Sequence, residues 1–142
     1  MAAHIIKMFQ AAVLLRFFGF RVTGSLEELS QSLLAFVTAL NPFQALLGVE
    51  LLILGQVFNA GVYSAIGEAG VYYGCRLGQN VPWYFGFPFS VVPHPQYLGA
   101  TISIWGMLIG LINEQNANKG LLYIGLTMSV YYAFSSYVES NL

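Results

Sequence analysis

An unbroken apolar run at residues 43–67, FQALLGVELLILGQVFNAGVYSAIG, limits the possible folds more than any other feature of the chain. Its single charged side chain is Glu50. The run is longer than the roughly 20 apolar residues that an α-helix needs to cross a bilayer. Asn41 and Pro42 precede it, and these residue types favour a helix start, with asparagine as the cap and proline in the first turn. The sequence therefore predicts a membrane helix over residues 42–66.

Two further apolar stretches, residues 97–112 and 121–138, are separated by the polar, turn-rich sequence NEQNANKG. They predict a hairpin of two spanning helices. Only 8% of the 142 residues are charged, whereas a soluble domain has about 25%. So few charges cannot cover a surface exposed to water. We expect an all-α integral membrane protein of one domain, with about three to four membrane helices and a long structured loop.

The first forty residues are expected to form membrane-associated and amphipathic helices ahead of a core over residues 41–142. Residues 1–22 contain three basic side chains and no acidic one, as in a mitochondrial presequence or a signal anchor. Within them, residues 5–20 predict a helix that enters the membrane or leans along it. Ser25 and Glu28 then form a capping-box pattern before an amphipathic helix, which we expect at the membrane interface.

Small and polar residues recur along one side of the predicted helix over residues 42–66. They are Gly48, Leu52, Gly55, Asn59 and Tyr63. Such a stripe marks a side that faces protein in a membrane. Two interpretations stay open, namely close helix packing and a ligand cavity lined by Gly55 and Asn59. Glu50 lies roughly opposite the stripe, where a carboxylate is costly unless it is paired or neutral.

The connector over residues 70–96 is too rich in proline for a long helix, with Pro82, Pro88, Pro93 and Pro95. It is either a re-entrant loop held at the interface by aromatic residues or a pocket wall whose polar groups are His94 and Arg76. After the connector the chain crosses the membrane twice. Glu139, near the chain end, should therefore return to the side of the connector and enclose a small polar chamber with it.

The stretch GEAGVYYGCRLGQNVPWYFGFPFSVVPHPQYLG, residues 67–99, resembles the core of the phospholipid N-methyltransferases, especially the short plant type. The end SSYVESNL is also similar, and the resemblance covers roughly residues 45–142. This family belongs with the membrane-embedded isoprenylcysteine carboxyl methyltransferases. The resemblance implies an enzyme that uses S-adenosylmethionine to methylate the amine of phosphatidylethanolamine or of its N-methylated forms. Membrane phospholipids would be its partners.

The resemblance also implies a cofactor site. In the family, a glycine pair before the connector and an acidic pair after the last helix contribute to it. Gly55 matches the second glycine, with Ile53 at the first position, and Glu139 matches the first acid, with Ser140 at the second. The turn from Pro95 to Gly99 matches well. The residues assigned to the cofactor are Gly55, Asn59, Tyr72, Pro95, Tyr97, Gly99 and Glu139.

Methyl transfer to an amine needs positioning of the two reactants and removal of a proton. Histidine titrates near neutral pH, so His94 is the first candidate for the base, with Glu68 and Glu139 as alternatives. A role of His94 in hydrogen bonding to the loop backbone or the cofactor is equally open. Arg76 could bind the lipid phosphate or the cofactor carboxylate. Aromatic rings could flank a sulfonium or a methylated ammonium, and they are Tyr72, Tyr73 and Trp83.

A second hypothesis is an inactive, methyltransferase-derived accessory subunit of a mitochondrial respiratory or ATP synthase complex, which could hold a lipid. Two features favour this hypothesis, namely the carboxylate of Glu50 within an apolar helix and Ile53 at the position where the family has its first glycine. The expected location is the endoplasmic reticulum or the mitochondrial inner membrane. The pattern implies no metal, because His4 and His94 lack ligand spacing and the single cysteine cannot form a cysteine-based site. A net charge of -1 offers no basic footprint for nucleic acid.

Overall fold

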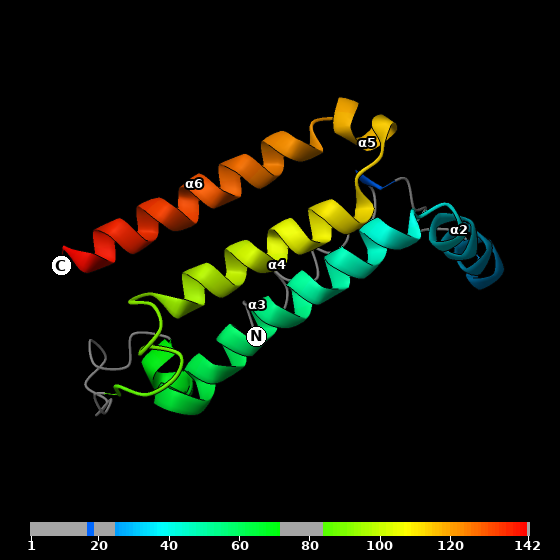
Figure 1. Ribbon diagram of the computed structural model, residues 1–142. Coiled ribbons are helices and arrows are strands. Elements are labelled where there is room, and N and C mark those ends of the chain that lie inside the picture. The colour runs from blue at the N-terminus through cyan, green and yellow to red at the C-terminus, as the bar shows by residue number, and fades with distance from the viewer. Residues whose placement is uncertain (1–16, 19–24, 72–83, 142) are drawn as a thin grey trace. The chain divides into compact units, whose positions relative to one another are not determined.

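The computed structural model describes residues 17–18, 25–71 and 84–141, which form helices and loops with no strand among them (Figure 1). The chain separates into two compact units, residues 1–41 and 42–142. The predicted helix over residues 5–20 falls almost entirely outside the described residues.

Helix α2, Leu26–Thr38, belongs to the first unit. Its start is explained by Ser25, whose side chain accepts a hydrogen bond from the backbone amide of Glu28 at 3.2 Å. This confirms the serine half of the predicted capping box. None of the side chains of α2 is buried, and Leu26 and Leu34 are largely exposed. The amphipathic helix is therefore present, and its place at a membrane interface stays a prediction.

Helix α3, Pro42–Val71, opens the second unit. The first backbone amides of a helix have no hydrogen-bond partner within the helix. Proline suits the first position because it has no amide hydrogen that would need a partner. Gly67 interrupts the helix with φ 68° and ψ 178°, a conformation that side chains disfavour and glycine adopts readily. Within Pro42–Gly67, a stretch of 18 residues reaches a mean hydropathy of 1.7. The predicted membrane helix over residues 42–66 is thus confirmed as a helix, with Gly67 as its end.

The expected helical hairpin is also present, with a difference at its tip. Helix α4 covers Pro95–Leu111, and helix α6 covers Leu121–Ser140. Between them, the expected turn contains a short helix, α5, at Glu114–Asn118. The side chains of Asn113 and Asn116 each accept the other's backbone amide at 2.8 Å. This reciprocal pair stabilises one helical turn, and turn-forming residue types alone did not indicate it.

Glycines allow α3 and α4 to approach closely. A Cβ atom added at Gly48 would lie 2.7 Å from the carbonyl oxygen of Gly106 and 2.7 Å from the Cα of Gly110. A Cβ at Gly55 would lie 2.6 Å from the carbonyl oxygen of Gly99. No side chain fits at such distances, so these residues let the two backbones touch. The prediction that this stripe faces protein is confirmed at Gly48 and Gly55, whereas Tyr63, at the end of the stripe, is 42% exposed.

Helix α4 is the central helix of the second unit, with α3 on one side and α6 on the other (Figure 1). Its contact with α6 includes a hydrogen bond of 2.9 Å from Trp105 Nε1 to Ser129 Oγ. At Gly125, an added Cβ would collide with Leu108 Cδ1. Small residues thus bring α6 against α4 as well.

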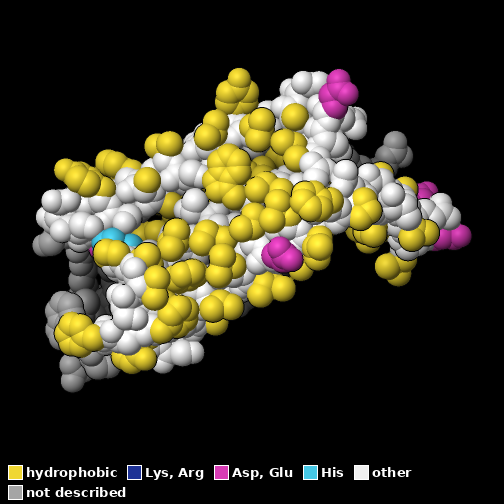
Figure 2. Space-filling view, viewed as in Figure 1, with side chains coloured by type: hydrophobic (Ala, Val, Ile, Leu, Met, Phe, Trp, Pro, Cys, Tyr) yellow, Lys and Arg dark blue, Asp and Glu magenta, His cyan; other side chains and the backbone are white. Residues whose placement is uncertain are grey.

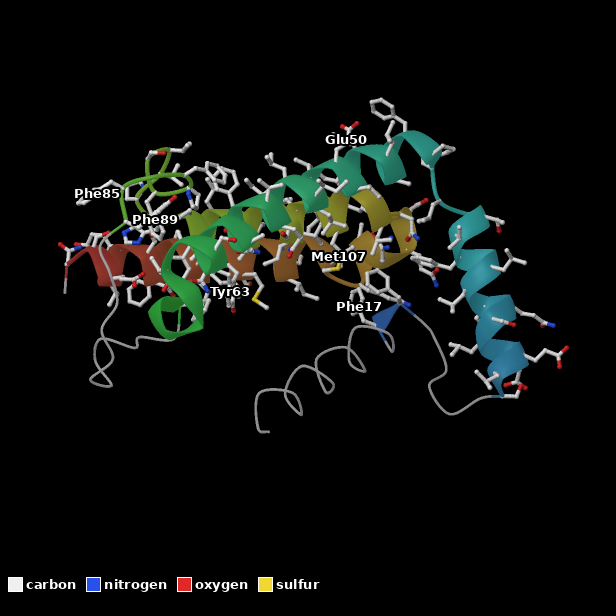
Figure 3. The ribbon with its side chains drawn as sticks, turned by 90° about the horizontal axis from the view of Figure 1, so that it is seen from below. Phe17, Glu50, Tyr63, Phe85, Phe89 and Met107 are labelled. Carbon is white, nitrogen blue, oxygen red and sulfur yellow. The ribbon has the colours of Figure 1, made fainter. Side chains whose placement is uncertain are left out.

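The outward faces of α3 and α6 are strongly apolar (Figure 2). Glu50 points outward from α3 (Figure 3), as expected for a position opposite the glycine stripe. Two helices of the described residues, Pro42–Gly67 and Leu121–Ser140, are long and apolar enough to cross a membrane. The 17 residues of α4 span about 26 Å at 1.5 Å per residue. The all-helical class is therefore confirmed, whereas the count of three to four membrane helices is not.

Candidate functional site

The described part of the connector, residues 84–94, folds back against the end of α3. Three hydrogen bonds close its turn. The amide of Ser90 donates to the carbonyl of Gly86, and the amides of Val91 and Val92 donate to the carbonyl of Pro88. Pro88 is fully buried. A Cβ at Gly61 would lie 2.9 Å from the ring of Phe87. The absence of a side chain at Gly61 therefore lets this ring pack directly against α3. Figure 3 shows Phe85 and Phe89 on the connector, at the end of α3 away from Glu50.

His94 joins this connector to the last turn of α6. Its Nδ1 lies 3.5 Å from Glu139 Oε2, and its Nε2 lies 2.7 Å from Ser140 Oγ. The hydroxyl of Ser140 donates its only proton to the carbonyl of Ser136 at 2.8 Å. With that bond made, Ser140 Oγ can accept from the His94 tautomer that carries its proton on Nε2. The other ring nitrogen, Nδ1, then faces the carboxylate.

This contact tests the predicted topology. Glu139 was expected on the side of the connector, because two helices separate them. The two residues are in contact, so that expectation is confirmed. Both side chains are partly exposed, at 25% for His94 and 41% for Glu139, so solvent or a ligand can reach them.

A hollow of about 290 Å³ lies beside His94 and Glu139, and we call it the polar chamber. Three segments form its walls, namely the end of α3, the connector with the start of α4, and the end of α6. Its lining residues are Val62, Ile66, Gly70, Val71, Phe89, Pro93, His94, Pro95, Gln96, Tyr97 and Glu139. The expected chamber between connector and chain end is therefore present.

A second hollow of about 380 Å³ lies between α4 and α6, and we call it the apolar groove. Its lining residues are Val92, Pro93, His94, Tyr97, Leu98, Thr101, Ser129, Tyr132, Ala133 and Ser136. Pro93, His94 and Tyr97 line both hollows. The ring of Tyr97 lies 6.1 Å from that of His94 and 6.1 Å from that of Tyr132, so a row of rings runs from one hollow to the other.

The structure brings some of the predicted site residues together. His94, Pro95, Tyr97 and Glu139 all line the polar chamber. Gly55, Asn59 and Gly99 line neither of the two hollows. They meet in the contact between α3 and α4, where a Cβ at Gly99 would lie 3.0 Å from Asn59 Oδ1. Their assignment to the cofactor stays a prediction.

Other predicted site residues cannot be placed. Tyr72, Tyr73, Arg76 and Trp83 lie outside the described residues. Glu68 belongs to α3, but its side chain is likewise outside the described part. Within that part, no group of three histidine, cysteine or acidic side chains is arranged to hold a metal ion.

Sequence reasoning assigned no role to Ser140 or Gln96. Gln96 stands in the predicted turn from Pro95 to Gly99, so its place in the chamber wall could have been inferred from that turn. Ser140 contacts a residue 46 positions away. No local spacing could have indicated this contact, because it depends on how α6 lies against the start of α4.

The similarity to known proteins covers the part of the chain that forms the polar chamber. The family model for phospholipid methyltransferases matches residues 43–142, which include every residue that lines the polar chamber. A phosphatidyl-N-methylethanolamine N-methyltransferase of Arabidopsis thaliana is 40% identical over 91 residues. That match covers 64% of this chain and 50% of the plant protein, so the chain spans about half the length of this relative. No solved structure matches the chain.

Proposed function

This chain belongs to the phospholipid methyltransferase family, and from that premise we propose that it methylates the headgroup amine of phosphatidylethanolamine or of its N-methylated forms. The methyl donor would be S-adenosylmethionine. The observation that carries the proposal is the contact of His94 with Glu139 at the wall of a polar chamber, within the matched residues. The protein would act as an integral membrane protein, in the endoplasmic reticulum or the mitochondrial inner membrane.

The chamber residues fit the chemistry of the methyl donor. S-adenosylmethionine supplies a methyl group activated on a sulfonium. The carboxylate of Glu139 can accept hydrogen bonds from hydroxyl or ammonium groups. The rings of Tyr97 and Phe89 offer faces that attract a cation, and Val62 and Ile66 offer an apolar wall. The volume of about 290 Å³ lies near the lower end of the range for small-molecule sites.

His94 would receive the proton of the substrate amine. With its Nε2 proton donated to Ser140, the neutral ring has its lone pair on Nδ1. This lone pair and the carboxylate of Glu139 are two acceptors that face each other at 3.5 Å. An ammonium group can donate to both. Once the proton moves to Nδ1, the imidazolium forms an ion pair with Glu139, and the amine lone pair becomes the nucleophile.

The remaining assignments belong to the same proposal. Pro95, Tyr97 and Glu139 would hold the methyl donor with Gly55, Asn59, Gly99 and Tyr72. Arg76, Tyr73 and Trp83 would bind the lipid headgroup, and Glu68 is the second candidate for the base. The family match does not favour the alternative of an inactive accessory subunit.

The test uses the full chain purified in detergent and reconstituted into phospholipid vesicles. Methyl transfer from labelled S-adenosylmethionine is measured with phosphatidylethanolamine and with phosphatidyl-N-methylethanolamine as separate substrates. Binding of the methyl donor is measured by calorimetry on the same preparation. We expect saturable binding and labelled lipid. Absence of both from protein that retains its helical circular dichroism would refute the proposed function.

A further inference from the structure

The apolar groove has the size of a ligand site and walls suited to hydrocarbon. Its volume of about 380 Å³ falls within the range for small-molecule sites. One wall comes from α6, a helix apolar enough to cross a membrane. The other comes from the first half of α4. An occupant of this groove would therefore lie along membrane helices, at their connector end.

Two of the five hydroxyl groups in the groove wall, those of Thr101 and Ser129, donate to carbonyls of their own helices. Thr101 Oγ1 donates to the carbonyl of Tyr97 at 2.8 Å. Ser129 Oγ donates to the carbonyl of Gly125 at 2.8 Å and accepts from Trp105 Nε1 at 2.9 Å. These residues have no proton left to donate to a ligand. At these two positions a polar headgroup would find no hydrogen-bond donor, whereas an alkyl chain needs none.

The groove lies next to the polar chamber, because Pro93, His94 and Tyr97 line both hollows. The chamber carries the carboxylate of Glu139 and the amide of Gln96, whereas the groove has no carboxylate among its lining residues. A polar site and an apolar site thus share one wall. A phospholipid has the matching form, because its polar headgroup and its acyl chains are joined through one glycerol.

We propose that the apolar groove holds one acyl chain of the phospholipid whose headgroup amine enters the polar chamber. The position of the headgroup in the chamber rests on the proposed function. The position of the acyl chain in the groove can be tested without measuring methyl transfer. The glycerol would lie beside His94 and Tyr97. The groove would then select lipids by acyl chain, and the chamber would select them by headgroup.

Ala133 offers a position at which to block the groove. It lines the groove on α6, does not line the chamber, and is exposed, so a phenylalanine there projects into the groove rather than into a packed core. Thr127 is a matched control on the same helix. It is exposed and lines neither hollow, and Thr127→Phe introduces the same ring.

The first experiment measures occupancy of the groove. The full chain is placed in vesicles that contain a phosphatidylcholine with a photoactivatable diazirine in one acyl chain, and labelled residues are mapped by mass spectrometry. We expect labelling at Tyr132 and Ser136 in the wild type and in Thr127→Phe, and at least a fivefold loss in Ala133→Phe. An excess of unlabelled long-chain lipid should compete, and a dihexanoyl lipid should not. Equal labelling in all three proteins, or competition by both lipids, would overturn the proposal.

The second experiment measures acyl-chain preference in methyl transfer, with dioleoyl and dihexanoyl phosphatidyl-N-methylethanolamine. We expect Ala133→Phe to lower the ratio of the long-chain rate to the short-chain rate about tenfold and Thr127→Phe to leave this ratio unchanged. An unchanged ratio in Ala133→Phe would overturn the proposal. If the wild type methylates neither lipid, the proposed function fails, and the labelling experiment still decides whether the groove holds an acyl chain.

Discussion

The imidazole of His94 lies 3.5 Å from the carboxylate of Glu139, although one residue precedes α4 and the other lies in the last turn of α6. The contact brings the connector and the end of the chain together at one wall of the polar chamber. It thereby places a ring nitrogen and a carboxylate side by side where a ligand can reach both. The first three predictions test this arrangement.

Replacement of Glu139 by glutamine should weaken both methyl-donor binding and methyl transfer. The amide keeps the shape of the side chain but removes its charge. A hydrogen bond to a charged group contributes about 1.5–3 kcal/mol, which corresponds to a loss of roughly 10- to 150-fold. Calorimetry and a labelled-methyl assay measure the two effects. Glu114→Gln on α5, an exposed residue that lines neither hollow, is the control and should retain wild-type values.

Replacement of His94 by alanine should lower the rate of methyl transfer by about 10²–10⁴, the range usual for loss of a general base. Binding of the methyl donor should change less, because the proposed role concerns the proton of the amine. Single-turnover rates at saturating donor separate these effects. A wild-type rate in His94→Ala would exclude a role as the base and leave Glu68 and Glu139 as the candidates.

Replacement of Ser140 by alanine should lower kcat by about two- to twelvefold, because a neutral hydrogen bond contributes about 0.5–1.5 kcal/mol. The hydroxyl positions His94 and does not contact the amine, so KM should be nearly unchanged. Ser140→Thr restores the hydroxyl and should restore kcat. Thr127→Ala removes a hydroxyl elsewhere on α6 and should have no effect. If Ser140→Thr were as slow as Ser140→Ala, the hydroxyl would not be the positioning group.

Replacement of Gly55 by alanine should destabilise the protein by about 1–3 kcal/mol. The added Cβ would lie 2.6 Å from the carbonyl of Gly99, so α3 and α4 would have to separate. This loss should exceed the gain of about 1 kcal/mol from the better helix propensity of alanine. Thermal unfolding in detergent measures it, with Val57→Ile on the exposed side of α3 as the control.

The same variant separates the two interpretations of the glycine stripe. If Gly55 serves close packing, Gly55→Ala should lower the unfolding temperature. If it serves only the cofactor, the variant should unfold at the wild-type temperature or above it, and only methyl-donor binding should fall.

Replacement of Asn116 by alanine should destabilise the hairpin tip by about 1–3 kcal/mol, because it removes two hydrogen bonds of its side chain. The side chain accepts from the amide of Asn113 at 2.8 Å and donates to the carbonyl of Leu111 at 2.7 Å. Thermal unfolding in detergent measures the change. Asn118→Ala removes an exposed asparagine from the same short helix and should cost much less.

Local sequence was sufficient to predict most of the helices. The apolar run predicted α3 to within a few residues of its kink at Gly67, and Ser25 and Pro42 indicated two helix starts. These features depend on hydrogen bonds between residues three or four positions apart, so a short window of sequence contains their cause. The helical turn at α5 was missed, because its cause is a reciprocal bond between two specific asparagines.

The order of the helices along the chain was also enough to place Glu139 on the side of the connector, because each crossing reverses the direction of the chain. Which atoms meet there was decided only by the tertiary structure. The glycines of α3 and α4 set the distance and rotation of those helices, and Gly125 and Trp105 do the same for α6. These packing contacts determine that Ser140 meets His94 and that an apolar groove opens beside the chamber, since both depend on the relative positions of helices that are far apart in sequence.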